Sequence, residues 1–196
     1  MYDADAKLAR INLGLIILIT LIWLYVIIMP FTAQFYFWVD SFAGQSDKLT
    51  RILKDPSTTL GASKTNQLIA PGMLLSAPIE ESDDPATLSR HVWRLPGSST
   101  PDKGGNTVLI SSRFSYSQPR GVFYFLDKLR PGDEFGVFWD GKLYRYHVTS
   151  SATVSGDWDA PLDNNTRQPT VTLYSATPLW FQAKRLAVTG ELVGAP

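Results

Sequence analysis

The chain of 196 residues contains no cysteine. This absence excludes a disulfide framework, a thiolate metal site and a cysteine nucleophile. It leaves the cellular compartment open, because exported proteins also occur without disulfides. Covalent acyl transfer by this chain would therefore need a nucleophile other than a thiol.

The chain also lacks an excess of charge of either sign, since 18 Lys and Arg balance 18 Asp and Glu. A nucleic-acid groove needs a basic stripe, so we expect no nucleic-acid partner. The two histidines, His91 and His147, lie far apart and without paired acidic residues, which argues against a zinc site. We expect neither a metal nor a cofactor.

One long apolar run lies near the N-terminus, where Ile11 to Met29 contains no charged residue. As a helix it would extend about 28 Å, close to the thickness of the hydrocarbon core of a bilayer. The alternative is a cleaved signal peptide, but the run is long and lacks a convincing small-x-small motif. We therefore expect residues 11–30 to be a membrane anchor in contact with lipid.

The distribution of basic residues predicts the orientation of this anchor. Lys7 and Arg10 precede it, and the next basic residue is Lys48. The positive-inside rule then places the N-terminus in the cytoplasm and everything after Pro30 outside. The residues that follow predict an aromatic belt at the outer interface: Phe31, Phe35, Tyr36, Phe37 and Trp38.

These features divide the chain of this single-pass protein into four parts. We expect a cytoplasmic tail at 1–10, the anchor at 11–30, a juxtamembrane linker at 31–65 and a folded domain at 66–196. From Ser41 to about Thr65 the linker is polar, with room for a short helix around residues 48–53.

The folded domain is rich in short strand patterns separated by turn signals. In "FGVFWDGKLYRYHVTS", Asp140-Gly141 supplies the positive φ values of a tight hairpin. Strands are also predicted for "MLLSAPI", "NTVLISS", "TVTLYSA" and "RLAVTGELV". Only "DDPATLSR" and "GVFYFLDKL" indicate brief helices. Many short strands with little helix predict a small, mainly β barrel.

The order of several motifs is similar to that of a bacterial sortase. The motifs are "STPDKGGNTVLISSRFSY", "VFYFLDKLRPGDEFGV", "GKLYRYHV", "TLYSATPLW" and "KRLAV". The resemblance covers roughly residues 69–193. It implies the sortase fold, an eight-stranded β-barrel with short helices, preceded here by one transmembrane helix.

The resemblance also implies which positions would carry the family's transpeptidation. In sortases a cysteine attacks the Thr-Gly carbonyl of a sorting signal, assisted by a histidine and an arginine. The cysteine position here is Ala176, the histidine position is Ser112 and the arginine is Arg185. Arg185 and Thr177 are the residues that the resemblance assigns to substrate binding.

The chemistry available at these positions differs from that of the family. Ala176 has no nucleophile, and alternation along a strand should point the hydroxyls of Ser175 and Thr177 away from the site. The hydroxyl of Ser112 is a poor nucleophile without a base, and the Arg185 guanidinium stays charged. Turnover by the family's route is therefore not expected. Arg185 either still holds a substrate or pairs with an acid in the strand pattern.

Three functions remain open from the sequence. The first is an inactive pseudo-sortase that binds a sorting-signal-like peptide or modulates the attachment of surface proteins. The second is a sortase enzyme whose cysteine and histidine were replaced, or which uses an unrecognised serine. The third is a structural module of the cell envelope. The expected partner is a sorting-signal peptide or a cell-envelope protein.

Overall fold

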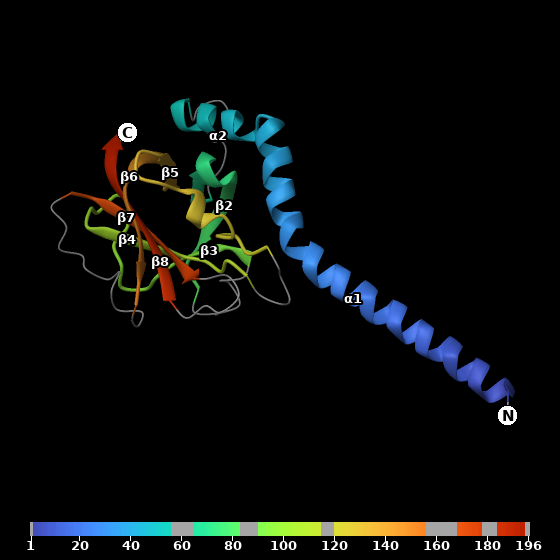
Figure 1. Cartoon of the computed structure of the whole chain (residues 1–196). Helices are drawn as coiled ribbons and strands as arrows, with labels where there is room; N and C mark the ends of the chain where they lie inside the picture. Colours follow the sequence, from blue (N-terminus) through green and yellow to red (C-terminus); the bar gives the residue numbers. More distant parts are fainter. Residues whose placement is uncertain are drawn as a thin grey trace. The chain divides into compact units, whose positions relative to one another are not determined.

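The computed structural model describes residues 2–55, 65–82, 90–114, 120–155, 168–177 and 184–194. The chain divides into two compact units, Met1–Ala43 and Gly44–Pro196, which are described in turn (Figure 1). The brief helix expected in "DDPATLSR" lies almost wholly outside the described residues.

The first unit is a single helix, α1 (Tyr2–Phe42). Its segment Lys7–Ile28 is long and apolar enough to cross a membrane. The helix runs through Pro30 into the stretch where the sequence predicted a linker, and it changes direction partway along its length (Figure 1). The helical part of the N-terminal region is therefore longer than the anchor alone.

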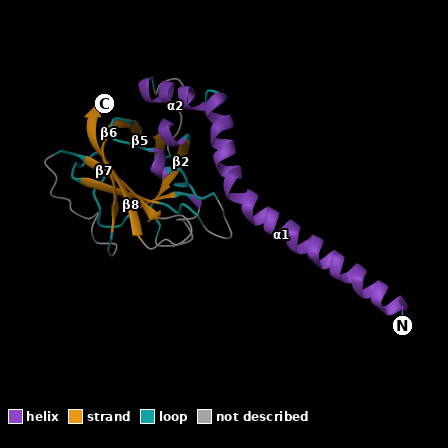
Figure 2. Ribbon diagram, viewed as in Figure 1, coloured by secondary structure: helices purple, strands orange, loops and turns teal. Residues whose placement is uncertain are grey.

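The second unit is a closed β-barrel with the strand order β1-β2-β3-β4-β7-β8-β6-β5 (Figure 2). The strands are β1 (Gln67–Ala70), β2 (Leu75–Glu80), β3 (Val92–Arg94), β4 (Asn106–Ile110), β5 (Glu134–Trp139), β6 (Lys142–Val154), β7 (Thr170–Thr177) and β8 (Lys184–Gly194). The eight-stranded barrel predicted from the sequence is confirmed.

Two of the strand pairings are parallel, β2 with β3 and β4 with β7, and the other six are antiparallel. The β5–β6 hairpin turns at Asp140 and Gly141, with φ values of 46° and 79°. This confirms the predicted turn, since both residue types tolerate the left-handed region.

The segment "GVFYFLDKL" forms turns and a short 3₁₀ helix, η3 (Leu126–Lys128), rather than a longer helix. Four of its hydrophobic side chains are buried: Phe123, Phe125, Leu126 and Leu129. Only Leu126 lies in the 3₁₀ helix itself, so the turns on either side also contribute to the core. A second 3₁₀ helix, η2 (Pro71–Met73), follows β1.

A short amphipathic helix, α2 (Gln45–Lys54), belongs to the barrel unit. Leu49 and Leu53 are buried in one cluster with Ile69 and Phe138. The sequence placed this helix in the linker, but its apolar face completes the core. The compact unit therefore begins at Gly44.

The parallel pair β4 and β7 forms the most deeply buried part of the wall. All five residues of β4 are buried, and β7 is buried from Thr170 to Ser175. The last two residues of β7, Ala176 and Thr177, are only half-buried. The wall therefore opens toward solvent where the sequence places its candidate site.

Candidate functional site

Ala176 and Arg185 lie directly opposite each other in the antiparallel β7–β8 pairing. Side chains of directly opposed residues project from the same face of the sheet, with Cβ atoms about 5 Å apart. Both residues are half-buried. The cysteine and arginine positions inferred from the sequence are thus brought together.

Ser112 lies beyond the end of β4, which runs parallel to β7. The last pair in that ladder is Ile110 with Tyr174, and the amide of Ser111 donates to the Tyr174 carbonyl at 3.4 Å. Continuing this register by two residues brings Ser112 level with Ala176. By this extrapolated register, the segment after β4 carries Ser112 beside Ala176 of β7, and Ala176 in turn pairs with Arg185 of β8.

The Ser112 hydroxyl is covered by the chain around Gly121. A Cβ on Gly121 would lie 2.3 Å from the Ser112 carbonyl oxygen and 2.7 Å from its Oγ. The Phe123 amide donates to the Ser112 carbonyl at 3.0 Å. Ser112 Oγ is buried and has no hydrogen-bond partner among the described residues. Nothing described here acts as a base for this hydroxyl.

The hydroxyls that flank Ala176 along β7 are engaged by the protein. Ser175 is buried and donates from Oγ to the Ser111 carbonyl at 2.5 Å. Thr177 Oγ1 accepts from Nη1 of Arg113 at 3.4 Å. Both hydroxyls thus serve contacts within the barrel, and neither replaces the missing thiol at Ala176.

Arg113 is a residue of the site that the sequence reasoning missed. Its side chain is 5% exposed. Nη2 donates to Asp127 Oδ1 at 2.5 Å, and Nε and Nη2 donate to the Tyr124 carbonyl at 3.2 and 3.1 Å. Burial lowers the pKa of the Arg113 guanidinium, and the Asp127 carboxylate opposes this shift. With its contact to Thr177, Arg113 joins the η3 segment to the end of β7.

The available signal for Arg113 was its position directly after Ser112, with an acid in "FLDK" downstream. That pattern does not reveal burial, because an arginine beside a loop is more often exposed. Only the folded chain shows that its side chain is buried against the η3 segment.

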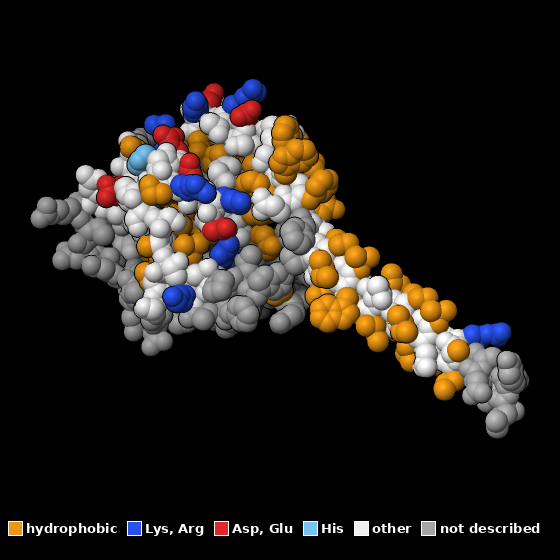
Figure 3. All heavy atoms as spheres, in the orientation of Figure 1, with side chains coloured by type: hydrophobic (Ala, Val, Ile, Leu, Met, Phe, Trp, Pro, Cys, Tyr) orange, Lys and Arg blue, Asp and Glu red, His pale blue; other side chains and the backbone are white. Residues whose placement is uncertain are grey.

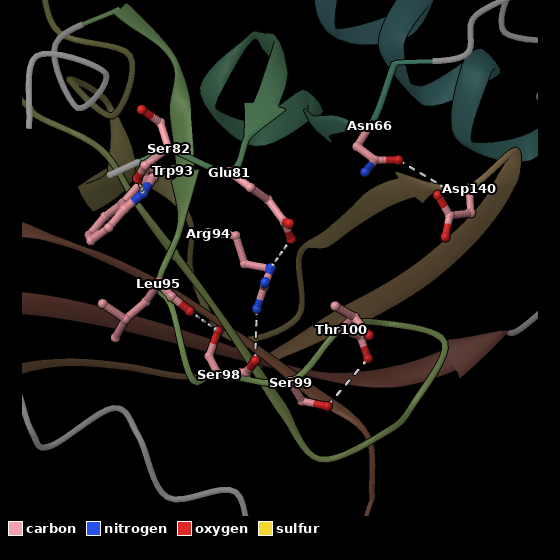
Figure 4. Close-up of polar contacts among 10 residues, drawn as sticks. All are labelled: Asn66, Glu81, Ser82, Trp93, Arg94, Leu95, Ser98, Ser99, Thr100 and Asp140. Atoms are coloured by element: carbon pink, nitrogen blue, oxygen red, sulfur yellow. Dashed lines mark hydrogen bonds and ion pairs between the residues drawn. The ribbon is translucent and has the colours of Figure 1, made fainter. Parts of the chain in front are cut away.

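A second polar cluster holds β3 against the end of β2 (Figure 4). Arg94 Nε donates to the Glu81 carboxylate, and its Nη1 donates to the Ser98 carbonyl at 2.8 Å. Trp93 Nε1 donates to the Ser82 carbonyl at 2.5 Å. These contacts fix the short parallel pair β2–β3, which has only two residue pairs in register.

The β3 end of this cluster reaches the candidate site through His91. Ser111 Oγ donates to the His91 carbonyl at 2.8 Å, and His91 Nδ1 lies 3.3 Å from Glu80 Oε2. The backbone next to Ser112 is therefore supported from β3 as well as from β7. His147, in contrast, is exposed on β6.

The described residues contain no group of three histidine or acidic side chains that would suit a metal ion. The three positions inferred from the sequence provide the methyl group of Ala176, the covered hydroxyl of Ser112 and the guanidinium of Arg185. Such a site can donate hydrogen bonds to a peptide carbonyl but offers no activated nucleophile.

Comparisons with known proteins identify the family of the barrel. The family model described as "Sortase domain" matches residues 68–193. No curated protein matches the chain.

Several solved structures are similar to the chain. The pilus-related sortase C of Group B Streptococcus has 26% identity and a TM-score of 0.59, over 68% of this chain and 69% of its own. Sortase C-1 of Actinomyces oris has 27% identity and a TM-score of 0.60, over 74% and 82%. Sortase A of Corynebacterium diphtheriae, a lid mutant with 21% identity and a TM-score of 0.60 over 72% and 77%, shares the fold. With the barrel, the motif order and the family model in agreement, the chain belongs to the sortase family.

Proposed function

We propose that this protein is a membrane-anchored pseudo-sortase that binds an extended, sorting-signal-like peptide without cleaving it. The observation that carries the proposal is the β7–β8 register, which sets Ala176 opposite Arg185. This register supports Arg185 as the counterpart of the family's substrate-binding arginine, next to a position whose side chain is only a methyl group.

The loss of catalysis follows from the chemistry of the two substituted positions. Acyl transfer needs a nucleophile whose deprotonated form is accessible near neutral pH, and the chain has no thiol. Ser112 can neither take a proton from a nucleophile nor donate one as imidazolium does. Removing such groups typically costs catalysis several orders of magnitude.

The guanidinium group of Arg185 supports the proposal that the protein still binds a peptide. A guanidinium presents five donors in fixed geometry, which suits carbonyl groups of an extended peptide. Thr177 at the end of β7 is the second proposed contact. One structural neighbour is described as pilus-related. A pilin-like surface protein is therefore a proposed source of the peptide, and attachment of such proteins is the process that this protein would modulate.

The side of the membrane on which the peptide would bind depends on the orientation of α1. We propose that residues 11–30 span the membrane once, with Lys7 and Arg10 on the cytoplasmic side and the barrel outside. The apolar segment Lys7–Ile28 supports this topology by its length and composition.

A structural envelope module is the second candidate, favoured by the covered Ser112. Gly121 lies so close to Ser112 that a Cβ on Gly121 would be 2.7 Å from Ser112 Oγ, so a larger side chain at 112 would compete with this segment for space. If the rest of the groove has closed in the same way, the barrel would bind no peptide.

Peptide binding by the compact unit, residues 44–196, distinguishes the two candidates. We expect fluorescence polarisation to detect binding of at least one peptide in a Thr-Gly panel. Arg185→Ala should abolish it, because the guanidinium group is removed. Lys184→Ala is the matched control, because this exposed neighbour projects from the opposite face of β8. No binding by the unaltered chain, or equal losses in both variants, would favour the structural module.

A restoration experiment tests whether the chemistry alone is missing. Ala176→Cys combined with Ser112→His should cleave the bound peptide only if the segment around Gly121 moves aside. The unaltered chain should show no cleavage. Cleavage by the unaltered chain would overturn the proposal and revive an enzyme with an unrecognised nucleophile. The natural codons at positions 112 and 176 would show whether Ser112 and Ala176 are the native residues.

A further inference from the structure

The helix α1 continues well beyond the segment that can cross a membrane. The candidate span ends at Ile28, whereas the helix ends at Phe42. At 1.5 Å per residue, the stretch 29–42 adds about 21 Å of helix. If this stretch stood upright, it would project out of the hydrocarbon core into water.

The extension carries an aromatic stripe on one face. Phe35, Trp38 and Phe42 are separated by three and four residues, so they lie on the same side of the helix. Their rings contact each other, with centroids 6.4 Å apart for Phe35–Trp38 and 4.5 Å for Trp38–Phe42. They are 61%, 57% and 75% exposed. Hydrophobic side chains are prominent along this helix in Figure 3.

The other face of the extension has a different character. Phe37, Asp40 and Ser41 are half-buried, and Asp40 is the only charged residue between positions 29 and 42. Ser41 Oγ donates back to the Phe37 carbonyl at 2.7 Å, which satisfies the hydroxyl locally. Tyr36 is also exposed, at 52%, and lies off the stripe, about 100° around the helix from Phe35. Three of the exposed rings thus share one face of the extension, while Asp40 and Ser41 lie on the other.

A lipid surface is the partner that this stripe fits. Phenylalanine and tryptophan rings favour the boundary between headgroups and acyl chains, and amphipathic helices lie in that plane. The stripe also lies on the same helix as the candidate membrane span, about two turns beyond its end. Pro30 lies between them and has no amide hydrogen for the helix, so a bend there is inexpensive.

We propose that residues 31–42 lie flat on the outer membrane surface, with Phe35, Trp38 and Phe42 inserted at the headgroup–acyl boundary. The inference rests on the membrane anchor of the proposed function. It differs from an aromatic belt around an upright helix, because only one face contacts lipid. Since only Ala43 and Gly44 separate α1 from α2, the inclination of this segment decides how far from the lipid the following chain begins.

The absence of cysteine makes a direct test possible. Single-cysteine variants of the full chain would carry a nitroxide label in vesicles of phosphatidylethanolamine and phosphatidylglycerol. Collision rates with oxygen and with a water-soluble nickel chelate then report the depth of each label. The positions are Ile19→Cys in the anchor, Phe35→Cys, Trp38→Cys and Phe42→Cys on the stripe, and Gln34→Cys and Ser41→Cys beside it.

We expect the three stripe labels to share one shallow depth and to collide at least threefold more often with oxygen than with the chelate. The labels at 34 and 41 should show the reverse preference, so that depth follows the helical period. A steady loss of depth from 34 to 42 would mean an upright helix and would overturn the inference. Stripe labels shielded from both reagents would mean a protein partner, which also overturns it.

The label at position 19 separates this inference from the proposed topology. Suppose that the label at position 19 is deep in lipid while the labels at 34–42 show the profile of an upright helix. This result would contradict the flat helix but support the membrane anchor. If the label at position 19 collides with the chelate, the result would contradict the membrane anchor, and therefore also the flat helix that depends on it.

Discussion

The two positions to which the sequence resemblance assigns the cysteine and the histidine lie in very different surroundings. Ala176 is at the half-buried end of β7 and faces Arg185 across the ladder. Ser112 lies under the chain around Gly121, with its hydroxyl buried. The first position is partly open to solvent and faces a guanidinium. The second is covered by backbone.

This difference predicts how readily each function can return. A thiol at position 176 adds little volume beside a retained guanidinium, so a cysteine should be accepted there. An imidazole at position 112 must displace backbone near Gly121, which packed interiors resist. Regaining a nucleophile should therefore be easier than regaining a base.

The largest expected effect comes from Gly121→Ala, which tests how tightly Ser112 is covered. The new Cβ would meet backbone atoms of Ser112, with the carbonyl oxygen at 2.3 Å. Since that carbonyl already accepts from Phe123, we expect a loss of about 3 kcal/mol in the free energy of unfolding. Urea denaturation measures it.

Gly136→Ala is the matched control, because the two atoms nearest to a Cβ there are side-chain ends of Leu53 and Leu143, at 2.5 and 2.9 Å, and the Tyr144 carbonyl oxygen lies at 3.6 Å. Such side-chain ends can shift, so a loss of about 1–2 kcal/mol is expected. Equal losses in the two glycine variants would contradict the tight cover over Ser112.

Asp127→Asn tests the interior arginine that joins the covering segment to the end of β7. The variant leaves the buried Arg113 guanidinium without its charged acceptor, while Asp127 itself is half exposed to solvent. We expect a loss of about 1–3 kcal/mol in thermal or urea unfolding. Asp140→Asn in the hairpin turn should change stability by less than about 0.5 kcal/mol, because asparagine also tolerates a positive φ. A neutral Asp127→Asn would show that Arg113 does not depend on this pair.

Ala176→Cys tests whether position 176, the half-buried one of the two, is accessible to solvent. The new thiol would be the sole one in the chain, so its alkylation by iodoacetamide reports both access and pKa. With Arg185 opposite, the pKa of the thiol should fall below its usual value. Adding Arg185→Ala should slow alkylation at pH 7 by about threefold to tenfold. Adding Lys184→Ala should change the rate much less. A thiol that reacts only after denaturation would show that this position is closed as well.

The smallest effect is expected from removing the covered hydroxyl. Ser112 Oγ has no partner among the described residues, so Ser112→Ala should be neutral or stabilise the fold by up to about 1 kcal/mol. Ser175→Ala removes a buried hydrogen bond to the Ser111 carbonyl and should cost about 1 kcal/mol. Calorimetry on the pair measures both. A destabilised Ser112→Ala would reveal a contact made by this hydroxyl.

The elements that the sequence predicted are those with strong local signals. Alternation marked β7, the Asp140-Gly141 pair marked the β5–β6 hairpin, and the motif order located Ala176, Ser112 and Arg185. The strands β1 and β3 were not identified, because they have four and three residues and show no usable period. The helix α2 was noticed, but its docking on Ile69 and Phe138 depends on contacts with β1 and β5.

The sequence by itself determined the chemical inventory of this protein: an apolar anchor segment, no thiol, and a methyl group and a hydroxyl where the family places cysteine and histidine. These are properties of residue types and need no fold. Only the tertiary structure decided that Arg185 faces Ala176, that Gly121 covers Ser112 and that the Arg113 side chain is buried. Each of these depends on strands and loops far apart in the chain, whose pairing is set by the packing of the whole barrel rather than by any local pattern.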